Sequence, residues 1–235
     1  MGFEKLSSPG LKGTFVQRLQ GMILSGELLV GSKLPPERTL AEQMHISRTV
    51  VNSGLAELAE QGFLEVRPRQ GTYVADYRSQ GNLDTLAAIT RYREGALDRE
   101  DVRSVLEVRQ SLEQLAADHA IRDASDEALE RLGVPLARIA AAADADEAAQ
   151  AAFTFRHELA LAGGNTILPL LFYSLRDPLI ALWTRYCGRY GNLAAVRNTE
   201  TLYSFIKNRD ADGTSCWINA YLKRVISGCQ QIYES

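Results

Sequence analysis

Residues Leu34–Val74 read LPPERTLAEQMHISRTVVNSGLAELAEQGFLEVRPRQGTYV, and this stretch decides how the N-terminal part of the chain folds. Pro36 favours the start of a helix, because the N–H that proline lacks would be unpaired in the first turn anyway. That helix is expected to break at His45-Ile46, and Ser47 is a suitable N-cap for the next one. The pattern therefore predicts two short helices joined by a tight turn.

The flanking residues complete a small domain. Upstream, apolar residues from Phe15 to Ile23 follow helical spacing. Downstream, the third helix is expected to end at Gly62. Two β-like runs, 63–67 and 72–75, follow and are joined by PRQG, which indicates a hairpin. Three helices and a hairpin in this order predict a winged helix-turn-helix domain.

In a helix-turn-helix pair the second helix enters the major groove of DNA, led by its N-terminal residues. Here Arg48 can donate two hydrogen bonds to a guanine edge, and Asn52 can pair with an adenine edge. Hydroxyls at the helix start can hold phosphates, and the hairpin tip can lie along a minor groove. Taken one by one, surface arginines would look the same in a protein that binds no DNA. The candidate DNA-binding residues are Arg38, Ser47, Arg48, Thr49, Asn52, Arg69, Gln70 and Gly71.

The remaining chain shows only helical patterns, with no β-alternation. Asp146 is a candidate N-cap, and Gly163-Gly164 is a helix stop. Pro135 is expected to kink or split one helix, and Pro169 and Pro178 are expected to start, kink or break another. The predicted helices are 83–92, 99–121, 125–142, 146–162, 166–190, 197–209 and 213–233.

Composition places the chain among ordinary globular proteins. It has 235 residues, 46% of them hydrophobic, and a net charge of −3. Residues 1–78 carry nine basic and eight acidic side chains, a balance that permits contact with nucleic acid without demonstrating it. No apolar run approaches the ~20 residues of a membrane span. The N-terminus also lacks the layout of a signal peptide, so we expect a cytoplasmic protein with no membrane partner.

The N-terminal stretch resembles the GntR family of bacterial transcription regulators. Over residues 12–76, short motifs follow one another in the family's order: LPPER, LAEQ, SRT, LAEQGFL and QGTYV. Two positions depart from the family pattern, namely Arg69, where glycine is usual, and Asn52, where arginine is frequent. The resemblance implies sequence-specific binding of double-stranded DNA, and the two departures concern only which operator is read.

An all-helical effector domain behind such a head resembles the FadR subfamily. One branch holds a metal through an Asp and three His and responds to organic acids. The other branch resembles the fatty-acid regulator FadR and senses acyl-CoA without that metal. LDTL, AGGN and LWTR in this chain resemble landmarks of the acyl-CoA branch. No metal and no other cofactor is expected, because the metal-ligand positions fall on Ala152, Arg156, Thr199 and Tyr221.

Arg109 points to a ligand pocket independently of the resemblance. It lies inside the apolar stripe of the helix predicted over 99–121. An unpaired charge buried there would be costly, so Arg109 needs an anion. Either a ligand carboxylate or phosphate supplies that anion in a bidentate fork, or Glu113, one turn on, forms an internal ion pair.

Other candidates for the effector pocket each have two interpretations. Arg156 borders an apolar stripe and would supply positive charge to the pocket, unless it forms a surface or interdomain ion pair. Trp183, Tyr186 and Tyr190 form an aromatic stripe, flanked by arginines, that is either core or a ligand contact. Tyr221 is bulky enough to narrow a pocket. The candidate effector-binding residues are Arg109, Arg156, Trp183, Arg185, Tyr186, Tyr190, Tyr221 and Arg224.

We therefore expect a mostly α fold, with a winged helix-turn-helix domain over 1–76, a linker over 77–84 and an all-α effector-binding and dimerisation bundle over 85–235. As a homodimer it would read a palindromic operator. A small anionic effector would change its DNA affinity: fatty acyl-CoA is the first expectation and a small organic or sugar acid the alternative. A DNA-binding protein without an effector is the remaining possibility. No GxSxG, HExxH or phosphate-loop motif occurs, so we do not expect an enzyme.

Overall fold

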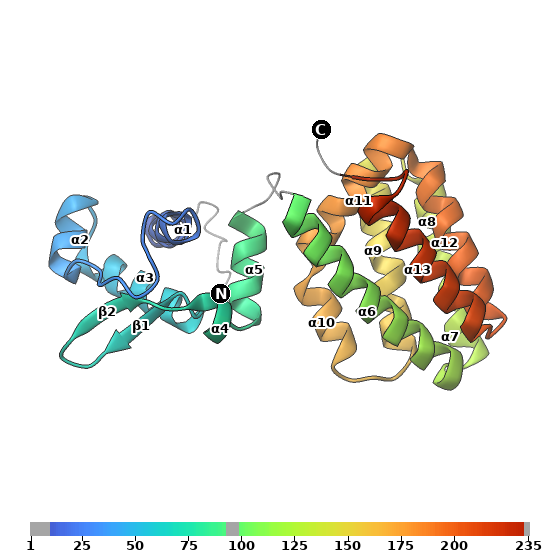
Figure 1. Ribbon diagram of the computed structural model, residues 1–235, viewed down its shortest axis with the longest axis horizontal. Coiled ribbons are helices and arrows are strands. Elements are labelled where there is room, and N and C mark those ends of the chain that lie inside the picture. Colours follow the sequence, from blue (N-terminus) through green and yellow to red (C-terminus); the bar gives the residue numbers. More distant parts are fainter. Residues whose placement is uncertain (1–9, 93–98, 233–235) are drawn as a thin grey trace, which may run out of the picture. The chain divides into compact units, whose positions relative to one another are not determined.

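The computed structural model describes residues 10–92 and 99–232, and the chain divides into two compact units after Tyr92 (Figure 1). The first unit comprises α1 Leu11–Leu24, α2 Glu37–Gln43, α3 Arg48–Glu60, β1 Leu64–Arg67, β2 Gly71–Val74, α4 Tyr77–Gln80 and α5 Leu83–Tyr92. The second comprises α6 Arg99–Asp123, α7 Asp126–Arg131, α8 Gly133–Ala141, α9 Ala145–Ala162, α10 Leu168–Ser174, α11 Arg176–Tyr190, α12 Asn192–Lys207 and α13 Ala211–Ser227.

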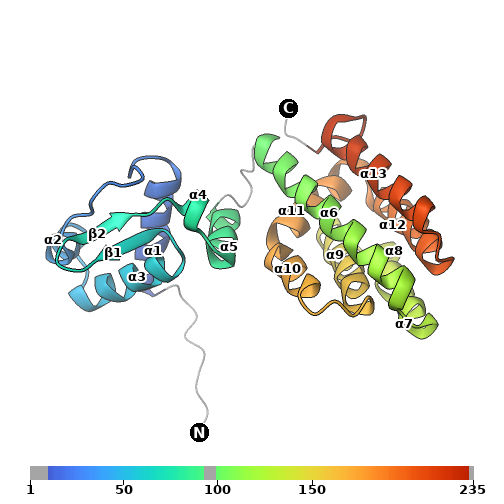
Figure 2. The same cartoon turned by 60° about the horizontal axis from the view of Figure 1, so that its bottom comes forward.

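The first unit has the predicted winged helix-turn-helix fold. Helices α1 and α3 pack together, and the antiparallel β1–β2 hairpin lies beside α3 (Figure 2). The core between them is made of apolar side chains such as Phe15, Val51, Leu58 and Phe63, each no more than 2% exposed. Burial of these side chains stabilises the unit and fixes the orientation of α3.

The first unit extends further along the chain than predicted. Residues 77–84 were expected to form a linker, and 85 onward to belong to the second domain. Instead, Asn82 caps α5, and its Nδ2 donates to the Glu60 carbonyl at the end of α3 (2.9 Å). The Thr85 hydroxyl donates to the Gln61 carbonyl, and Ala88 joins the apolar core of the first unit. These contacts attach α5 to the first unit, so the boundary lies after Tyr92.

The second unit is a helical bundle in which α9 packs against α6, α8, α10 and α11. Ala148 and Ala152 on α9 are completely buried, and their small side chains let neighbouring helices approach closely. Arg156 follows one turn later, so the same packing carries its long side chain into the interior. Among the described residues, no helix combines the length and the apolar character that crossing a membrane requires.

Several predicted helix boundaries change. The helix predicted over 125–142 is split at Leu132, and the one predicted over 166–190 is split at Leu175, which agrees with the expected effect of proline. The N-cap of α9 is Asp144, whose carboxylate accepts from the Glu147 N–H at 2.9 Å, and not Asp146. Helix α12 starts at 192, five residues early, because Gly191 ends α11 with a φ of 80°. The last helix ends at 227 instead of 233.

Candidate DNA-binding surface and effector site

The start of α3 presents polar side chains to solvent. Ser47 is the N-cap, and its hydroxyl accepts from the Val50 N–H at 3.3 Å. Because this cap fixes where the helix begins, Arg48, Thr49 and Asn52 fall on its first two turns, and all three are exposed. Their donors and acceptors are therefore available to base edges and phosphates, as the helix-turn-helix geometry requires.

The hairpin presents a second set of exposed residues. Arg69 and Gln70 form its tip, and Arg69 has a φ of 61°, in the left-handed region that favours glycine. Gly71 has a φ of 114° and packs beside the Lys33 side chain. On the hairpin stem, the Arg67 guanidinium lies 4.3 Å from the centre of the Tyr73 ring and pairs with Glu65 at 2.8 Å, so the unpaired positive charge of the hairpin is at its tip.

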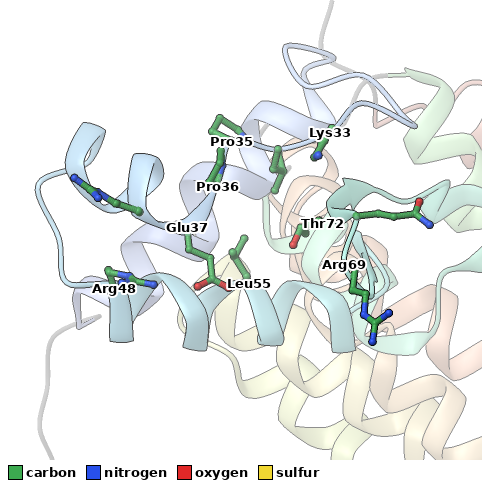
Figure 3. Close-up of a pocket in the computed structure, with 12 residues that line it drawn as sticks. Lys33, Pro35, Pro36, Glu37, Arg48, Leu55, Arg69 and Thr72 are labelled. Carbon is green, nitrogen blue, oxygen red and sulfur yellow. The ribbon is translucent and has the colours of Figure 1, made fainter.

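These elements line a common pocket of about 460 Å³ (Figure 3). Arg48 lies at the start of α3, Arg69 lies on the hairpin, and Glu37 points towards α3 near Leu55 (Figure 3). Lys33, which the sequence reasoning did not select, also lines this pocket, and only the pairing of its backbone with Tyr73 brings it there. The remaining lining residues are Leu34, Pro35, Pro36, Arg38, Gln70, Gly71 and Thr72.

In the second unit, three charged side chains meet in the interior. Arg109 Nε donates to one oxygen of Glu113 at 3.0 Å, and Arg156 Nε donates to the other at 3.1 Å. All three residues are only 2% exposed. Two guanidinium groups therefore share one carboxylate, and the cluster carries one net positive charge. A buried excess charge is unfavourable unless an anion compensates it.

Arg156 is held by further hydrogen bonds. Its Nη1 donates to the Ala152 carbonyl at 3.1 Å and to the Thr199 hydroxyl at 3.3 Å, and its Nη2 donates to Asn198 Oδ1 at 3.0 Å. Because a guanidinium only donates, Asn198 must turn its oxygen towards Arg156 and its amide nitrogen away. Two buried donors, Asn198 Nδ2 and Arg109 Nη2, have no hydrogen-bond partner among the described residues. Unpartnered buried donors of this kind suggest a missing acceptor.

The surroundings shift the pKa values of this cluster. Burial alone would raise the pKa of Glu113, but the guanidinium groups of Arg156 and Arg109 outweigh it and hold that pKa below its usual range. Burial raises the pKa of the Tyr221 hydroxyl, which therefore remains protonated. The ionised carboxylate is thus an integral part of the folded unit.

Aromatic rings enclose the two guanidinium groups. The Trp183 ring centre lies 4.5 Å from the Arg109 guanidinium carbon and 4.4 Å from that of Arg156. Tyr221 stacks on Trp183, with ring centres 6.2 Å apart, and Tyr186 contacts both rings edge-on. Trp183 and Tyr186 are therefore core residues, as one of their two interpretations required, and they also form the wall of the cationic cluster.

A pocket of about 190 Å³ lies beside this cluster. Asn198 and Tyr221 line it, so it lies against the residue that carries the orphaned amide nitrogen and against the aromatic residue next to Arg109. Arg197 and Arg224 also line it and bring two further cations. The other lining residues are Tyr186, Ala194, Thr201, Trp217 and Gln230.

Comparison with known proteins identifies the family. A model described as bacterial regulatory proteins, gntR family, matches residues 11–74, and the FCD domain matches residues 104–224. The chain is 32% identical to the HTH-type transcriptional regulator LutR of Bacillus subtilis, over 90% of this chain and 95% of that protein. The chain belongs to the GntR family of bacterial regulatory proteins. Its first unit carries the GntR domain, and its second unit is an FCD domain.

Other relatives match this GntR-family chain less completely. The transcriptional regulator Mce2R of Mycobacterium tuberculosis is 42% identical over 87 residues, which are 37% of this chain and 36% of that protein. The solved structure of Lar, which controls the expression of the Listeria monocytogenes agr system, superposes with a TM-score of 0.64. At 14% identity, over 96% of this chain and 97% of Lar, this likeness concerns the fold alone.

The predicted effector residues divide into three groups in this GntR-family chain. Tyr186, Tyr221 and Arg224 line the pocket, whereas Arg109, Arg156 and Trp183 form the buried cluster beside it. Tyr190 is half-buried, and its hydroxyl donates to the Gln231 carbonyl at 2.7 Å; Arg185 does not line this pocket. The expected alternative for Arg156, a surface or interdomain ion pair, is wrong because the pair it forms is buried within one unit. The sequence did not indicate four further lining residues, because only tertiary packing brings them together: Arg197, Asn198, Trp217 and Gln230.

The residues at the expected metal-ligand positions do not fit a divalent cation. Ala152, Arg156 and Thr199 do converge in the structure, and Tyr221 also contacts the cluster, which supports the alignment of these positions. They offer a guanidinium, a carbonyl and hydroxyls in place of the nitrogen and carboxylate ligands that such ions prefer. Within the described residues, no group of three His, Cys, Asp or Glu side chains is placed to hold a metal.

Proposed function

We propose that this chain is a transcription regulator whose affinity for DNA is controlled by a small organic acid bound in the FCD domain. The observation that carries this proposal is the net positive buried cluster, with its orphaned donors Arg109 Nη2 and Asn198 Nδ2, beside a pocket in the same unit. A carboxylate would compensate the charge and accept from a donor. Ligand binding and DNA binding would then be coupled, each changing the affinity for the other by the same factor.

On the DNA side, the exposed start of α3 would enter the major groove, and the hairpin would track the backbone. Acting as a homodimer, the protein would read a palindromic operator with half-sites roughly 34 Å apart. The cations that line the pocket of the first unit, Lys33, Arg38, Arg48 and Arg69, would neutralise phosphates. Binding would therefore weaken steeply as the salt concentration rises.

Pocket size favours a small acid over fatty acyl-CoA. The pocket of about 190 Å³ is below the ~300–1,000 Å³ of sites that hold drug-sized molecules. Trp183, Tyr186 and Tyr221 are packed at this end of the bundle and each is at most 3% exposed, so these rings leave little room beside the pocket for a long acyl chain. Acyl-CoA remains the second candidate, supported only by the sequence landmarks of the FadR branch. We also propose that no metal takes part, because Arg156 would repel a cation.

DNA binding is tested on a duplex enriched by the wild-type protein from a random library. Fluorescence anisotropy then compares Arg48→Ala with Arg131→Ala, a control at an exposed arginine of the FCD domain. Loss of a bidentate base contact costs roughly 1–3 kcal/mol, so Arg48→Ala should bind about 10- to 100-fold more weakly. Wild-type affinity in Arg48→Ala would refute the assignment of α3 as the recognition helix.

Effector binding is tested by thermal shift with small carboxylic and sugar acids, fatty acid, long-chain acyl-CoA and free CoA, each with and without EDTA. A ligand at about 100 times its dissociation constant stabilises the protein by ~2.7 kcal/mol, which is measurable. Arg109→Ala should abolish the shift yet keep DNA binding, since Glu113 still pairs with Arg156. A shift with acyl-CoA alone, or a loss of stability in EDTA, would contradict the small-acid, metal-free proposal.

A further inference from the structure

The charges that line the FCD pocket are all of one sign. Of its nine lining residues, two are arginines and none is acidic. Neither Arg197 nor Arg224 has an ion-pair partner among the described residues. The nearby carboxylate of Glu113 is already shared between Arg109 and Arg156. The pocket therefore has more positive charge than a single carboxylate neutralises.

The positive groups form two separate poles. The inner pole is Asn198 Nδ2, which the Arg156–Asn198 hydrogen bond orients away from Arg156 and which lies beside the net positive cluster. Asn198 is 5% exposed, so this donor is desolvated. The outer pole consists of Arg197, which is exposed, and Arg224, which is half-buried. A buried residue with a free donor and two more exposed cations, all lining one pocket, suit a ligand with two anionic ends.

The outer pole is held in place by the chain beyond the FCD match, which ends at residue 224. The Arg224 guanidinium lies 5.0 Å from the centre of the Trp217 ring, and its Nε donates to Gln230 Oε1 at 3.4 Å. Gln230 Nε2 in turn donates to the Tyr186 hydroxyl at 3.2 Å. The C-terminal residues thus keep the Arg224 cation over the pocket, although aromatic and amide groups alone do not neutralise it.

We propose that the effector is a small dicarboxylate that bridges the two poles. One carboxylate accepts from Asn198 Nδ2 and compensates the charge of the buried cluster, and the other binds Arg197 and Arg224. Guanidinium–carboxylate bonds are charge-assisted and roughly twice as strong as neutral ones, so the second carboxylate adds affinity that a monoacid lacks. This inference rests on the proposed function, because it assigns the chemistry of the same effector.

The two tryptophans of the chain make the test direct. Trp217 lines the pocket and Trp183 lies against the buried guanidinium groups, so both are placed to report ligand binding by their fluorescence. The full-length protein is titrated with succinate, glutarate and adipate, each compared with the monoacid of equal length, butyrate, pentanoate or hexanoate. At least one diacid should bind about 10-fold more tightly than its monoacid, a difference of ~1.4 kcal/mol.

Single substitutions test the contribution of each pole to ligand binding. Arg224→Gln should reduce the affinity of the preferred diacid to that of its monoacid, whereas Lys223→Gln, the adjacent exposed residue on α13, should change neither affinity. Asn198→Asp keeps the size and the acceptor for Arg156 but replaces the donor with a negative charge, so both acids should lose binding. Unfolding curves of each variant confirm that the fold is retained.

The outcomes separate this inference from the function on which it rests. If monoacids bind as tightly as diacids of the same length, or if Arg224→Gln and Lys223→Gln weaken diacid binding equally, the two-pole inference is wrong while the small-acid effector stands. If none of the six acids is bound, the dicarboxylate inference is wrong, and the thermal-shift panel with its sugar acids decides separately whether the small-acid effector stands. A preference for diacids that disappears in Arg224→Gln and persists in Lys223→Gln supports the inference.

Discussion

Glu113 on α6 and Arg156 on α9 form an ion pair that is almost completely enclosed, with 3.1 Å between Oε1 and Nε. The other oxygen of the same carboxylate accepts from Arg109 at 3.0 Å. Glu113 is thus the shared counter-charge of two arginines in the interior of the FCD domain.

Replacement of Glu113 by glutamine should strongly destabilise the FCD domain. It would leave two buried guanidinium groups without a counter-charge, and breaking a buried pair in this way costs about 3–5 kcal/mol. The free energy of unfolding is measured in urea, followed by tryptophan fluorescence, because Trp183 lies against both arginines. In the control, Glu107→Gln removes an exposed pair with Arg103 on the same helix and should cost less than about 1 kcal/mol. Equal effects of the two changes would show that Glu113 is not the essential counter-charge.

The ionisation of Glu113 should make the free energy of unfolding depend on pH. The pKa of Glu113 is lower in the folded protein than in the unfolded chain, where it is about 4.3. At pH values between these two pKa values, the unfolded state therefore binds more protons than the folded state. The stabilisation is complete above pH ~4.3 and is lost as the pH falls through the folded pKa. Urea unfolding between pH 3 and pH 6 should therefore show a steeper acid decline for the wild type than for Glu113→Gln. Parallel curves would contradict the pKa shift.

Arg69→Gly should separate stability from DNA binding at the hairpin tip. The φ of 61° is unfavourable for an L-residue by roughly 1–2 kcal/mol, so glycine should leave stability unchanged or raise it by up to about 1 kcal/mol. DNA affinity should still fall, and the slope of affinity against salt should drop by about one, because a cation is lost. Gln70→Gly, at a tip position without positive φ, should lower stability instead. Thermal unfolding and anisotropy measure the two effects, and an unchanged salt slope would show that Arg69 does not contact phosphate.

Thr85→Val should weaken the DNA-binding unit even though residue 85 follows the hairpin by eleven positions. The Thr85 hydroxyl donates to the Gln61 carbonyl after α3 and accepts from the Asn82 N–H at 2.8 Å. Leaving such groups unsatisfied costs about 1–3 kcal/mol. Hydrogen exchange of the α1–α3 core amides should accelerate accordingly, whereas Ser53→Ala, at an exposed position of α3, should have little effect. Unchanged exchange in Thr85→Val would indicate that α5 does not stabilise this unit.

Much of the first unit could be predicted because its signals are local. The Ser47 cap, the apolar spacing of α1 and α3 and the turn at 68–71 each act over a few residues, and the structure has them as predicted. The proline-induced breaks in the FCD domain were predictable for the same reason. Helix ends such as the Asp144 cap and the start of α12 were not, because neighbouring caps compete and the surrounding fold selects one of them.

Local sequence patterns could not predict contacts between residues that are far apart in the chain. The polar residues after the hairpin indicate a linker. However, Thr85 bonds to Gln61, 24 residues earlier, and Ala88 is buried against core residues that are distant in the sequence. Likewise, the sequence presented Glu113 as one of two possible anions for Arg109. Nothing in it indicated that Arg156, 43 residues further along the chain, would share the same carboxylate.

The sequence by itself determined the winged helix-turn-helix, the exposed residues that begin α3 and the need of Arg109 for an anion. These follow from spacing, capping and the cost of burying a charge, which act along one element. Tertiary structure decided that α5 belongs to the DNA-binding unit and that Glu113 serves two arginines. It also decided that Asn198, Arg197 and Arg224 face one pocket. The reason is physical: the charge balance of a buried site depends on which helices pack together, and no single helix contains that information.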